Sequence, residues 1–541
     1  MYSKVSHLLP LLVLSVCLSL GKSLISIDPE SNHFIDSHNR QRFFHGLNAV
    51  YKEPPFHPST STTWDAQETL NAQDAKQLSD WGFNVIRLGV LWAGVEPVKG
   101  EYNYTYLEEI GTIIDTLAAE NIYTIIDMHQ DVLARNFCGN GIPGWAAELG
   151  ASEAKLPFPM PANMPLEKNS DGNPDLEACL SHDFIKYYFS GAVSKTFQAL
   201  YENHFGLLDA FVDYWKLTIS LFKDREYVLG YEIINEPWAG DIYSDPRRIF
   251  NAESSLLEPF YETVHTAMRT VDDEKIVFYE PLTYDVWPVG FQSNPVGGPE
   301  YDSKSAMSYH IYCPLAGGNH TPLVLKLACQ AVDWDFFHQR VQDIKRIGGG
   351  GMMTEWGSLS NSDLDLAELN HILRLADDYL VSHIYWQYKD YHDITSTGDA
   401  GISLYPGGEI QDDKISVLSR TYAEAVAGET LVMKYREDKN HFNLNYVPNI
   451  VSDPASADEE ATRTVVRVDR EHHYSGAWIH GIKVDVSWNG WEGEVSCSDD
   501  GRRIFLDHNG EGTGDDDVSQ LPEVDVHITP CHRFRDKECT C

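Results

Sequence analysis

Two glutamates stand at the ends of apolar runs, where a carboxylate is unexpected. Residues 231–238 read YEIINEPW, in which Asn235 and Glu236 close a run typical of a buried strand, and Glu355 closes a similar run, GMMTE. A buried carboxylate is costly unless the protein needs it there, although Asn, Glu and Pro would also suit a turn into solvent. Two carboxylates about 5–5.5 Å apart can cleave a glycosidic bond with retention, one as a protonated acid and the other as a nucleophile.

Further polar side chains lie in or directly after other short apolar runs: Lys52, Arg87, His129, Asp131, His310, Tyr312 and Trp386. Any one of them alone is more often structural than catalytic. If the runs are successive parallel strands, however, their carboxyl ends meet at one mouth. We therefore interpret the set as one site.

Each type of side chain has a role in that chemistry. Arg87 would favour the ionised form of Glu355, and a negative neighbour would raise the pKa of Glu236, as an acid requires. An amide such as Asn235 can bind a sugar hydroxyl, and a hydroxyl such as that of Tyr312 can orient the nucleophile. The aromatic face of Trp386 can stack on a sugar ring.

The elements that must position these residues follow one theme from about residue 43 to 388. Short β-branched and aromatic runs alternate with amphipathic helical patterns, and the runs cover 43–50, 83–90, 123–130, 228–235, 275–281, 305–312, 351–357 and 382–388. Eight nearly apolar strands alternating with helices predict an α/β fold, the (β/α)₈ TIM barrel. A doubly wound open sheet is the alternative, but no GxGxxG follows the first strand.

The chain is too long for one core, and we divide it into three parts. Residues 1–23 contain a basic residue, an apolar stretch and then small residues, as in a secretory signal peptide. Residues 28–428 form the predicted catalytic barrel. From residue 430 to 541 the pattern changes to short alternating runs, which predict a smaller antiparallel β-sandwich domain. Its expected role is to pack against the barrel.

Cysteines and sequons agree with secretion. Of nine cysteines, eight lie beyond the predicted signal peptide, and an even number in a secreted chain suggests disulfides. We expect neighbours to pair, Cys138 with Cys179 and Cys313 with Cys329. Asn103 and Asn319 lie in glycosylation sequons. The expected localisation is extracellular or a digestive lumen, with the lysosome as an alternative.

The net charge of −40 argues against nucleic-acid binding and against electrostatic docking on anionic membranes. No cysteine or histidine spacing resembles a zinc site. The acidic stretch at 510–517 is more typical of a solvated loop than of a calcium site. Because carboxylates suffice for the chemistry, we expect no cofactor and no metal, and we expect a monomer.

The motifs together resemble the clan of retaining glycosidases that includes glycoside hydrolase family 5. The resemblance rests on IRLGV, DMHQD, YEIINEP, SYHIY, MTEWG and YWQYKD, in this order along residues 40–427. It implies that Glu236 is the acid/base and Glu355 the nucleophile. It also places six other residues at the site positions of the clan: Arg87, His129, Asn235, His310, Tyr312 and Trp386.

A narrower resemblance is to the endoglycoceramidases of that family. It rests on GLNAVYKEPPF near the start, DMHQDV, RTYAEAVAGE and YKDYHDITSTGD, followed by a β-sandwich. It implies a glycosphingolipid substrate, cut between oligosaccharide and ceramide, with transient contact to a lipid surface and with a detergent or activator protein to present the lipid if one is needed. It further implies that Lys52 and Asp131 bind sugar hydroxyls beside Trp386.

Other functions remain open at this point. A polysaccharide endohydrolase of the same clan would need a groove lined by aromatics, and a glucosylceramidase would remove only a terminal sugar. The long third connection carries Phe184, Tyr187, Tyr188 and Phe189, which could contact lipid or pack beneath the loop. A binding protein on an inactive barrel is disfavoured because both glutamates are present.

Overall fold

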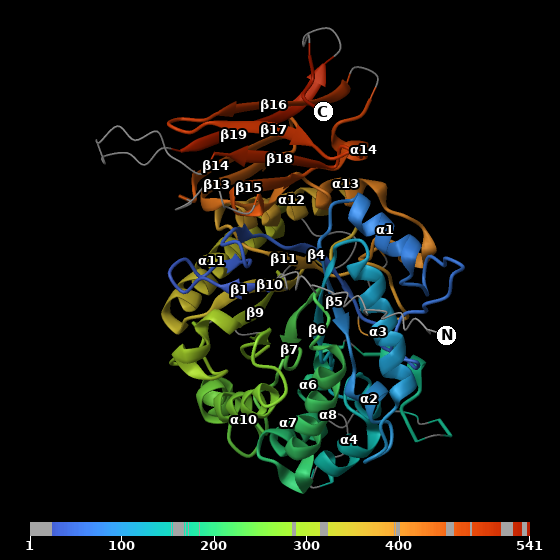
Figure 1. Cartoon of the computed structure of the whole chain (residues 1–541). Coiled ribbons are helices and arrows are strands. Elements are labelled where there is room, and N and C mark those ends of the chain that lie inside the picture. The colour runs from blue at the N-terminus through green and yellow to red at the C-terminus, as the bar shows by residue number, and fades with distance from the viewer. Residues whose placement is uncertain are drawn as a thin grey trace, which may run out of the picture.

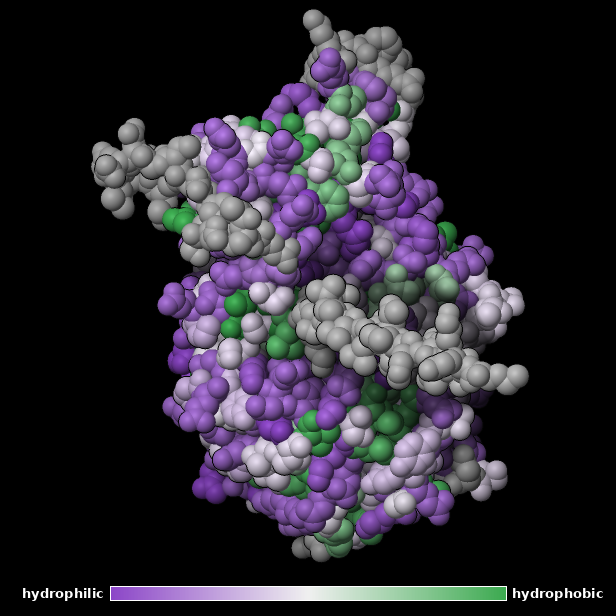
Figure 2. Space-filling view, in the orientation of Figure 1, coloured by the Kyte–Doolittle hydropathy of each residue, from purple (hydrophilic) through white to green (hydrophobic). Residues whose placement is uncertain are grey.

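The computed structural model describes residues 24–541 except 153, 155–166, 168, 171, 183, 284–287, 314–322, 394, 396–400, 451–458, 477–478, 510–522 and 533–537. The predicted signal peptide, the sequon at Asn319 and the acidic loop at 510–517 therefore lie outside the described residues. Within them, no helix is both long and apolar enough to cross a membrane. The face shown in Figure 2 is mainly hydrophilic, with scattered apolar patches.

The eight predicted barrel strands are confirmed. They form a closed parallel barrel in sequence order, with the last strand pairing with the first: β4 His45–Ala49, β5 Val85–Gly89, β6 Tyr123–Asp127, β7 Val228–Glu232, β8 Ile276–Tyr279, β9 Ser305–Ile311, β10 Gly350–Trp356 and β11 His383–Tyr385. Every residue of the first four strands is buried, as expected where helices cover the outer face and side chains fill the interior.

Amphipathic helices surround this barrel (Figure 1). The main ones are α1 Ala72–Asp80, α3 Tyr104–Ala118, α8 Leu207–Phe222, α10 Glu258–Arg269, α11 Leu323–Ile347, α12 Asp363–Asp378 and α13 Asp412–Leu418. In α3, Ile110, Ile113, Ile114 and Leu117 recur at helical spacing and are buried. The exposed Asn103 caps this helix by accepting the backbone N–H of Tyr106.

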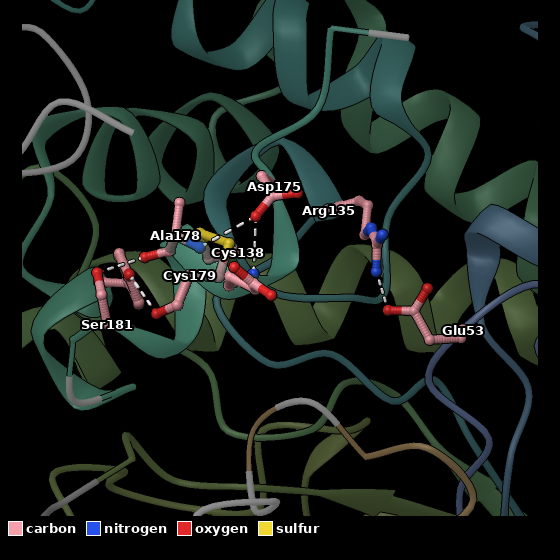
Figure 3. The surroundings of a disulfide bond; sticks show 9 residues. Glu53, Arg135, Cys138, Asp175, Ala178, Cys179 and Ser181 are labelled. Atoms are coloured by element: carbon pink, nitrogen blue, oxygen red, sulfur yellow. Dashed lines mark hydrogen bonds and ion pairs between the residues drawn. A yellow bond between two sulfur atoms is a disulfide. The ribbon is translucent and has the colours of Figure 1, made fainter. Parts of the chain in front are cut away.

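The long connection after β6 is itself helical. It contains η1 Arg135–Phe137, α4 Gly144–Ala151, α5 Leu176–Leu180, α6 Ile185–Tyr188, α7 Gly191–Tyr201 and η2 His204–Gly206. Figure 3 shows the disulfide Cys138–Cys179, which ties η1 to α5, and Asp175, which caps α5. The ion pair of Arg135 with Glu53 joins this connection to the loop after β4. The disulfide and the ion pair therefore hold together the segments on one side of the barrel mouth.

Shorter helical segments complete the barrel and its loops: α2 Trp92–Val95, α9 Arg248–Ala252, η3 Glu253–Leu257, η4 Gly298–Lys304 and η5 Pro406–Gly408. The second predicted disulfide, Cys313–Cys329, joins the end of β9 to α11. The structure also pairs Cys497 with Cys541 and Cys531 with Cys539, for which the sequence analysis named no partners.

The C-terminal part is the predicted antiparallel sandwich. Its elements are β12 Tyr422–Val426, β13 Gly428–Arg436, β14 His441–Pro448, η6 Glu459–Thr462, β15 Arg463–Arg467, α14 Arg470–His473, β16 Ile479–Ser487, β17 Gly493–Cys497, β18 Arg503–His508 and β19 Val524–His532. One sheet has the order β13-β14-β19-β16. Alternate residues of β14, Phe442, Leu444 and Tyr446, are buried between the sheets, which is the period that a half-buried strand requires.

The other sheet includes strands from the start of the chain. Its order is β1-β2-β3-β12-β15-β18-β17, where β1 is Ser26–Ile27, β2 Phe34–Ile35 and β3 Gln41–Arg42. Ile27 and Phe34 pack in the same cluster as Phe278 and Ile384 at the amino-terminal end of the barrel. The predicted boundary at 428–430 stays a prediction, but residues 26–42 share a sheet with the second domain, although the sequence grouped them with the barrel.

The sandwich packs against α12 (Figure 1). At this contact the Arg420 guanidinium donates to Asp377 Oδ2 at 2.8 Å and to the Tyr435 carbonyl at 2.9 Å. Burial raises the pKa of Asp377 to about 6, against the opposing effect of Arg420. The two parts are therefore joined by a buried polar contact as well as by the shared sheet.

Candidate active site

The predicted side chains meet at the carboxyl-terminal ends of the barrel strands, and Arg87 on β5 connects several of them. Arg87 is fully buried. Its Nη1 donates to Glu355 Oε1 at 2.6 Å and its Nη2 to Asn235 Oδ1 at 2.7 Å. Its Nε donates to Glu232 Oε2 at 2.6 Å. One guanidinium thus fixes side chains from β7 and β10 in a common plane of hydrogen bonds.

Glu355, near the end of β10, receives a donor on each oxygen. Arg87 reaches Oε1, and the Tyr312 hydroxyl donates to Oε2 at 2.9 Å. Arg87 and His310 lower the pKa of Glu355, but burial outweighs them and the net shift is upward. The expected effect of Arg87 is therefore present but smaller than the cost of burial. Two donors aimed at two oxygens suit a carboxylate that acts as a nucleophile.

Glu236 follows β7 in a left-handed backbone conformation with φ +42°, which costs energy for a residue with a Cβ and clusters at functional sites. Its Oε1 lies 2.9 Å from His310 Nδ1. Burial and the charge of Asp131 raise the pKa of Glu236 to about 7, in the direction that the sequence predicted. This carboxyl group is therefore suited to carry a proton near neutral pH.

The two glutamates are close enough to act on one bond. One oxygen of Glu236, one oxygen of Glu355 and a nitrogen of His310 all lie within 4.8 Å of one another. His310 Nδ1 is 3.5 Å from Glu355 Oε2. This spacing fits the short separation of a retaining pair and leaves too little room for a water between the carboxylates of an inverting pair.

A second cluster, formed by Lys52, Asp131, Asp393 and His129, lies on the β4 and β6 side of the mouth and is held together by ion pairs. Lys52 Nζ lies 2.7 Å from Asp131 Oδ2 and 3.0 Å from Asp393 Oδ1, and 4.4 Å from the centre of the Trp386 ring. Lys52 is buried and is therefore not a solvated lysine of a surface loop. Burial opposes the ionised form of Asp131, but Lys52 and His129 outweigh it and hold its pKa well below the usual range.

His129 joins this cluster to Trp386. The two rings stack with centroids 5.4 Å apart and planes 15° from parallel. Its nitrogens lie 2.8 Å from Asp127 and 3.2 Å from Asp131. Burial alone would lower the pKa of His129, but the two carboxylates raise it to about 9. The cluster therefore presents fixed charges beside an aromatic plane.

Both clusters line one cavity of about 260 Å³, whose wall includes Glu236, Glu355, Lys52, Asp131, Tyr312 and Trp386. The family model described as "Cellulase (glycosyl hydrolase family 5)" matches residues 50–392, and that of the "Glycoside hydrolase family 5 C-terminal domain" matches residues 420–519. The chain belongs to glycoside hydrolase family 5. It is thus a glycoside hydrolase on a TIM barrel.

Relatives within family 5 carry a more specific name. The chain is 36% identical to a protein named endoglycoceramidase from Cyanea nozakii, over 87% of this chain and 90% of the relative. It is also 36% identical to one from Hydra vulgaris, over 85% and 84% of the two chains. The solved structure of endo-glycoceramidase II from Rhodococcus sp. superposes with a TM-score of 0.67 at 21% identity, over 92% of this chain and 99% of that one, which supports the fold.

Several buried residues of this family 5 site were not predicted. Glu280, directly after β8, accepts the backbone N–H of Glu236 on Oε2 at 2.6 Å. Glu232 and Asn48 bind Arg87, and Asp393 binds Lys52. Glu280 could have been found, because the run FYEP repeats the pattern of a strand ending in Glu and Pro. The others carry no signal apart from their strand or loop.

Of the aromatic residues in the third connection, some pack beneath the loop and others are exposed or line a cavity, where they could contact lipid. Tyr187 and Tyr188 are buried and pack in the core, whereas 40% of the Phe189 side chain is exposed. Phe189 contacts Trp238, with ring centroids 5.1 Å apart. Phe184 lines the catalytic cavity.

Groups of acid and imidazole side chains close enough to hold a metal occur within this site, Glu236 with His310 and Glu355, and Glu232 with Glu280 and His310. The Arg87 guanidinium lies 2.6 Å from both Glu355 and Glu232, and its charge opposes a second cation there. In a third group, His480 with Cys531 and Cys539, the cysteines form a disulfide and are not thiolate ligands.

Proposed function

We propose that the chain is a secreted endoglycoceramidase that cleaves the β-glycosidic bond between oligosaccharide and ceramide with retention of configuration. The observation that carries this proposal is a change of surface at Glu236. On one side lie the charged groups around Lys52. On the other, the residues just after Glu236 open onto an apolar cavity of about 570 Å³. A substrate that is a sugar at one end and a lipid at the other fits both.

In the first step Glu236 is the acid. Its proton passes to the glycosidic oxygen as Glu355 attacks the anomeric carbon, so that the carbon–oxygen bond breaks and a glycosyl ester forms on Glu355. Ceramide leaves with the proton. The pKa of Glu236, raised to about 7 by burial and Asp131, supports this assignment.

In the second step Glu236, now ionised, takes a proton from water, whose oxygen attacks the anomeric carbon and releases the sugar from Glu355. Arg87 and Tyr312 hold Glu355 in place throughout, because each donates to one of its oxygens. Asn235 donates one Nδ2 hydrogen to the Gln130 carbonyl at 2.8 Å. Its second Nδ2 hydrogen is the donor that we assign to the sugar hydroxyl next to the reacting carbon.

The charged side binds the sugar. Lys52 and Asp131 are the proposed partners of sugar hydroxyls, and Trp386 with His129 behind it forms the stacking plane. Because Lys52 is already held by two carboxylates, it needs little reorganisation when a sugar arrives.

The apolar side receives the ceramide. Its cavity is lined by Ile185, Phe189, Trp238, Ala239, Ile249, Phe250 and Leu282. Phe250 is 80% exposed and Ile249 50%, so large apolar side chains face solvent at the rim. Such exposure is a cost to a monomer in water and is typical of a site for an apolar partner. A polysaccharide would offer this cavity no apolar group to bury.

Secretion is part of the proposal. The predicted signal at residues 1–23, the disulfides within the described residues and the exposed sequon at Asn103 support it. A detergent or an activator protein remains the proposed means of presenting the lipid.

The test is to incubate the purified protein with a ganglioside and, separately, with a soluble cellulose or mannan oligomer, and to identify the products by mass spectrometry. We expect intact oligosaccharide and free ceramide, neither of which forms with Glu355→Gln. Cleavage of only the soluble oligomer would retain the catalytic pair and reject the lipid substrate. Release of a single terminal sugar would favour a glucosylceramidase.

A further inference from the structure

Glu280 occupies a position behind the acid Glu236 that the reaction as described does not use. It follows β8 and is buried. Its Oε2 accepts the backbone N–H of Glu236 at 2.6 Å, and its Oε1 lies 3.2 Å from His310 Nε2. The opposite nitrogen of the same ring, Nδ1, lies 2.9 Å from Glu236 Oε1. A continuous path of contacts therefore runs from Glu280 through the imidazole to the catalytic carboxyl.

The protonation of this path follows from its burial. Burial and the charges of Glu232 and Glu236 raise the pKa of Glu280 well above its ordinary value and so favour its neutral, protonated form. Burial lowers the pKa of His310 to about 4, which makes its ring neutral as well. A neutral imidazole has one donor nitrogen and one acceptor nitrogen.

The directions of the hydrogen bonds can then be assigned. Glu280 Oε2 accepts from the backbone of Glu236, so we place the acid hydrogen of Glu280 on Oε1, which lies 3.2 Å from His310 Nε2, a buried nitrogen with no other hydrogen-bond partner among the described residues. Nε2 is then the acceptor, and the ring hydrogen must be on Nδ1. From there it is donated to Oε1 of Glu236. The catalytic proton of Glu236 is left on Oε2.

We propose that Glu280 is a positioning residue that fixes which nitrogen of His310 carries the hydrogen and, through it, which oxygen of Glu236 presents the catalytic proton. This inference rests on the proposed role of Glu236 as the acid. When the Oε2 proton passes to the leaving oxygen, the Nδ1–H bond stabilises the carboxylate that remains. Without Glu280 the ring can turn its acceptor nitrogen toward Glu236, which would draw the proton away from the substrate.

Charged and titratable groups face this path from the neighbouring strands. Around His310 they are Glu355, Arg87, Glu232 and His129, and around Glu236 they include Asp131 and Lys52.

The experiment compares a substrate that needs an acid with one that does not. A ganglioside has a poor alkoxide leaving group, whereas a dinitrophenyl β-glycoside of the same sugar leaves without protonation. We expect Glu280→Leu to lower kcat/KM, which reports only the steps up to formation of the glycosyl ester, by about 100-fold on the ganglioside, the lower range of general acid catalysis. The same variant should change kcat/KM of the dinitrophenyl reaction less than about threefold. Glu280→Gln, whose amide can still accept on oxygen and donate from nitrogen, should keep most of the ganglioside activity.

Equal losses on both substrates, or a Gln variant as poor as the Leu variant, would overturn the proposal. Glu236→Ala is the control: if it too fails to separate the two substrates, the acid role of Glu236 fails, and that is the proposed function rather than Glu280. A measurement on the unaltered protein avoids any folding defect. ¹⁵N spectra of labelled histidine, with His310→Gln to assign the signals, should show His310 protonated on Nδ1, and protonation on Nε2 would reject the assignment.

Discussion

The two sides of the catalytic pair are built in opposite ways. On the Lys52 side, cations, carboxylates and an aromatic plane are already bonded to one another before any substrate is present. On the Phe250 side, apolar side chains stand partly exposed around a larger cavity. The first can recognise hydroxyl groups by direction, and the second can only recognise an apolar shape. Specificity for the sugar and affinity for the lipid should therefore be separable by mutation.

The largest effect should come from the group that both sides share. Glu355→Gln removes the nucleophile and should lower kcat on every substrate by about 10⁴–10⁶-fold. Thermal unfolding of the variant checks that the fold persists. If cleavage of the ganglioside continues at more than a hundredth of the original rate, Glu355 is not the nucleophile.

Breaking the charged side should affect all substrates alike. Lys52→Met removes the cation that the buried Asp131 and Asp393 share and should lower kcat/KM by about 100-fold on both the ganglioside and a soluble aryl glycoside. Lys76→Met is the matched control, since Lys76 pairs with Asp80 on the surface and should change neither rate. A loss confined to the lipid substrate would contradict the assignment of this side to the sugar.

Breaking the apolar side should affect only the lipid. Phe250→Ser removes the most exposed aromatic of the rim and should raise KM for the ganglioside by about 10–30-fold, with no change for a soluble aryl glycoside. Ile450→Ser, at a site that is 79% exposed in the sandwich domain, serves as the control. An equal effect of the two variants would mean that the rim has no special role in binding.

The dependence of kcat/KM on pH should report the protonation of Glu236, which lies between the sugar side and the apolar side. Because the pKa of Glu236 is raised to about 7, its protonated form is complete at lower pH and is lost as the pH rises through 7. kcat/KM for the ganglioside should fall about tenfold per unit above that value. A dinitrophenyl glycoside should show no such decline. A profile for the ganglioside that is flat to pH 9 would place the acid elsewhere.

A smaller effect should come from Asp333, a buried acid whose neighbour is another acid, Glu368, whereas the neighbour of Asp131 is a cation. Asp333 of α11 faces Glu368 of α12, and burial together with this neighbouring carboxylate raises the pKa of Asp333 to about 8. A raised folded-state pKa stabilises the protein below about pH 4, and that stability is lost as the pH rises toward 8. Tm measured across this range should therefore fall more steeply for the unaltered protein than for Asp333→Asn, by a few degrees.

If the unaltered protein and Asp333→Asn show the same slope of Tm against pH, the pKa of Asp333 is not raised in the folded protein. The matched control is Asp365→Asn on α12, because Asp365 is paired with Lys326 of α11 and its pKa is lowered by that contact despite burial. Its removal should leave the slope between pH 4 and 8 unchanged, because a lowered carboxyl pKa affects stability only below about pH 4.

The sequence predicted the barrel, and it predicted which side chains meet at the barrel mouth, because both depend on local patterns. Each strand is a short apolar run, and each predicted side chain stands in its run or directly after it, so that strand order alone brings Arg87, Glu236 and Glu355 together. Glu280 ends such a run too and could have been found, but its contact with the backbone of Glu236 is one that no local pattern encodes. Asp333 and Glu368 meet only through the packing of two helices. The sheet membership of β1–β3 depends on partners far along the chain.

That last feature bears on how the protein is made. The strands β1–β3 are among the first to leave the ribosome, yet β3 pairs with β12 and extends a sheet that is completed by β15, β18 and β17. Until those later strands have been synthesised, Ile27 and Phe34 have no finished sheet to hold them over the end of the barrel. Translation that stops within the barrel should leave an unpaired strand edge and an uncovered apolar end, both of which favour aggregation. The shared sheet thus makes completion of the chain a condition for maturation of its catalytic half.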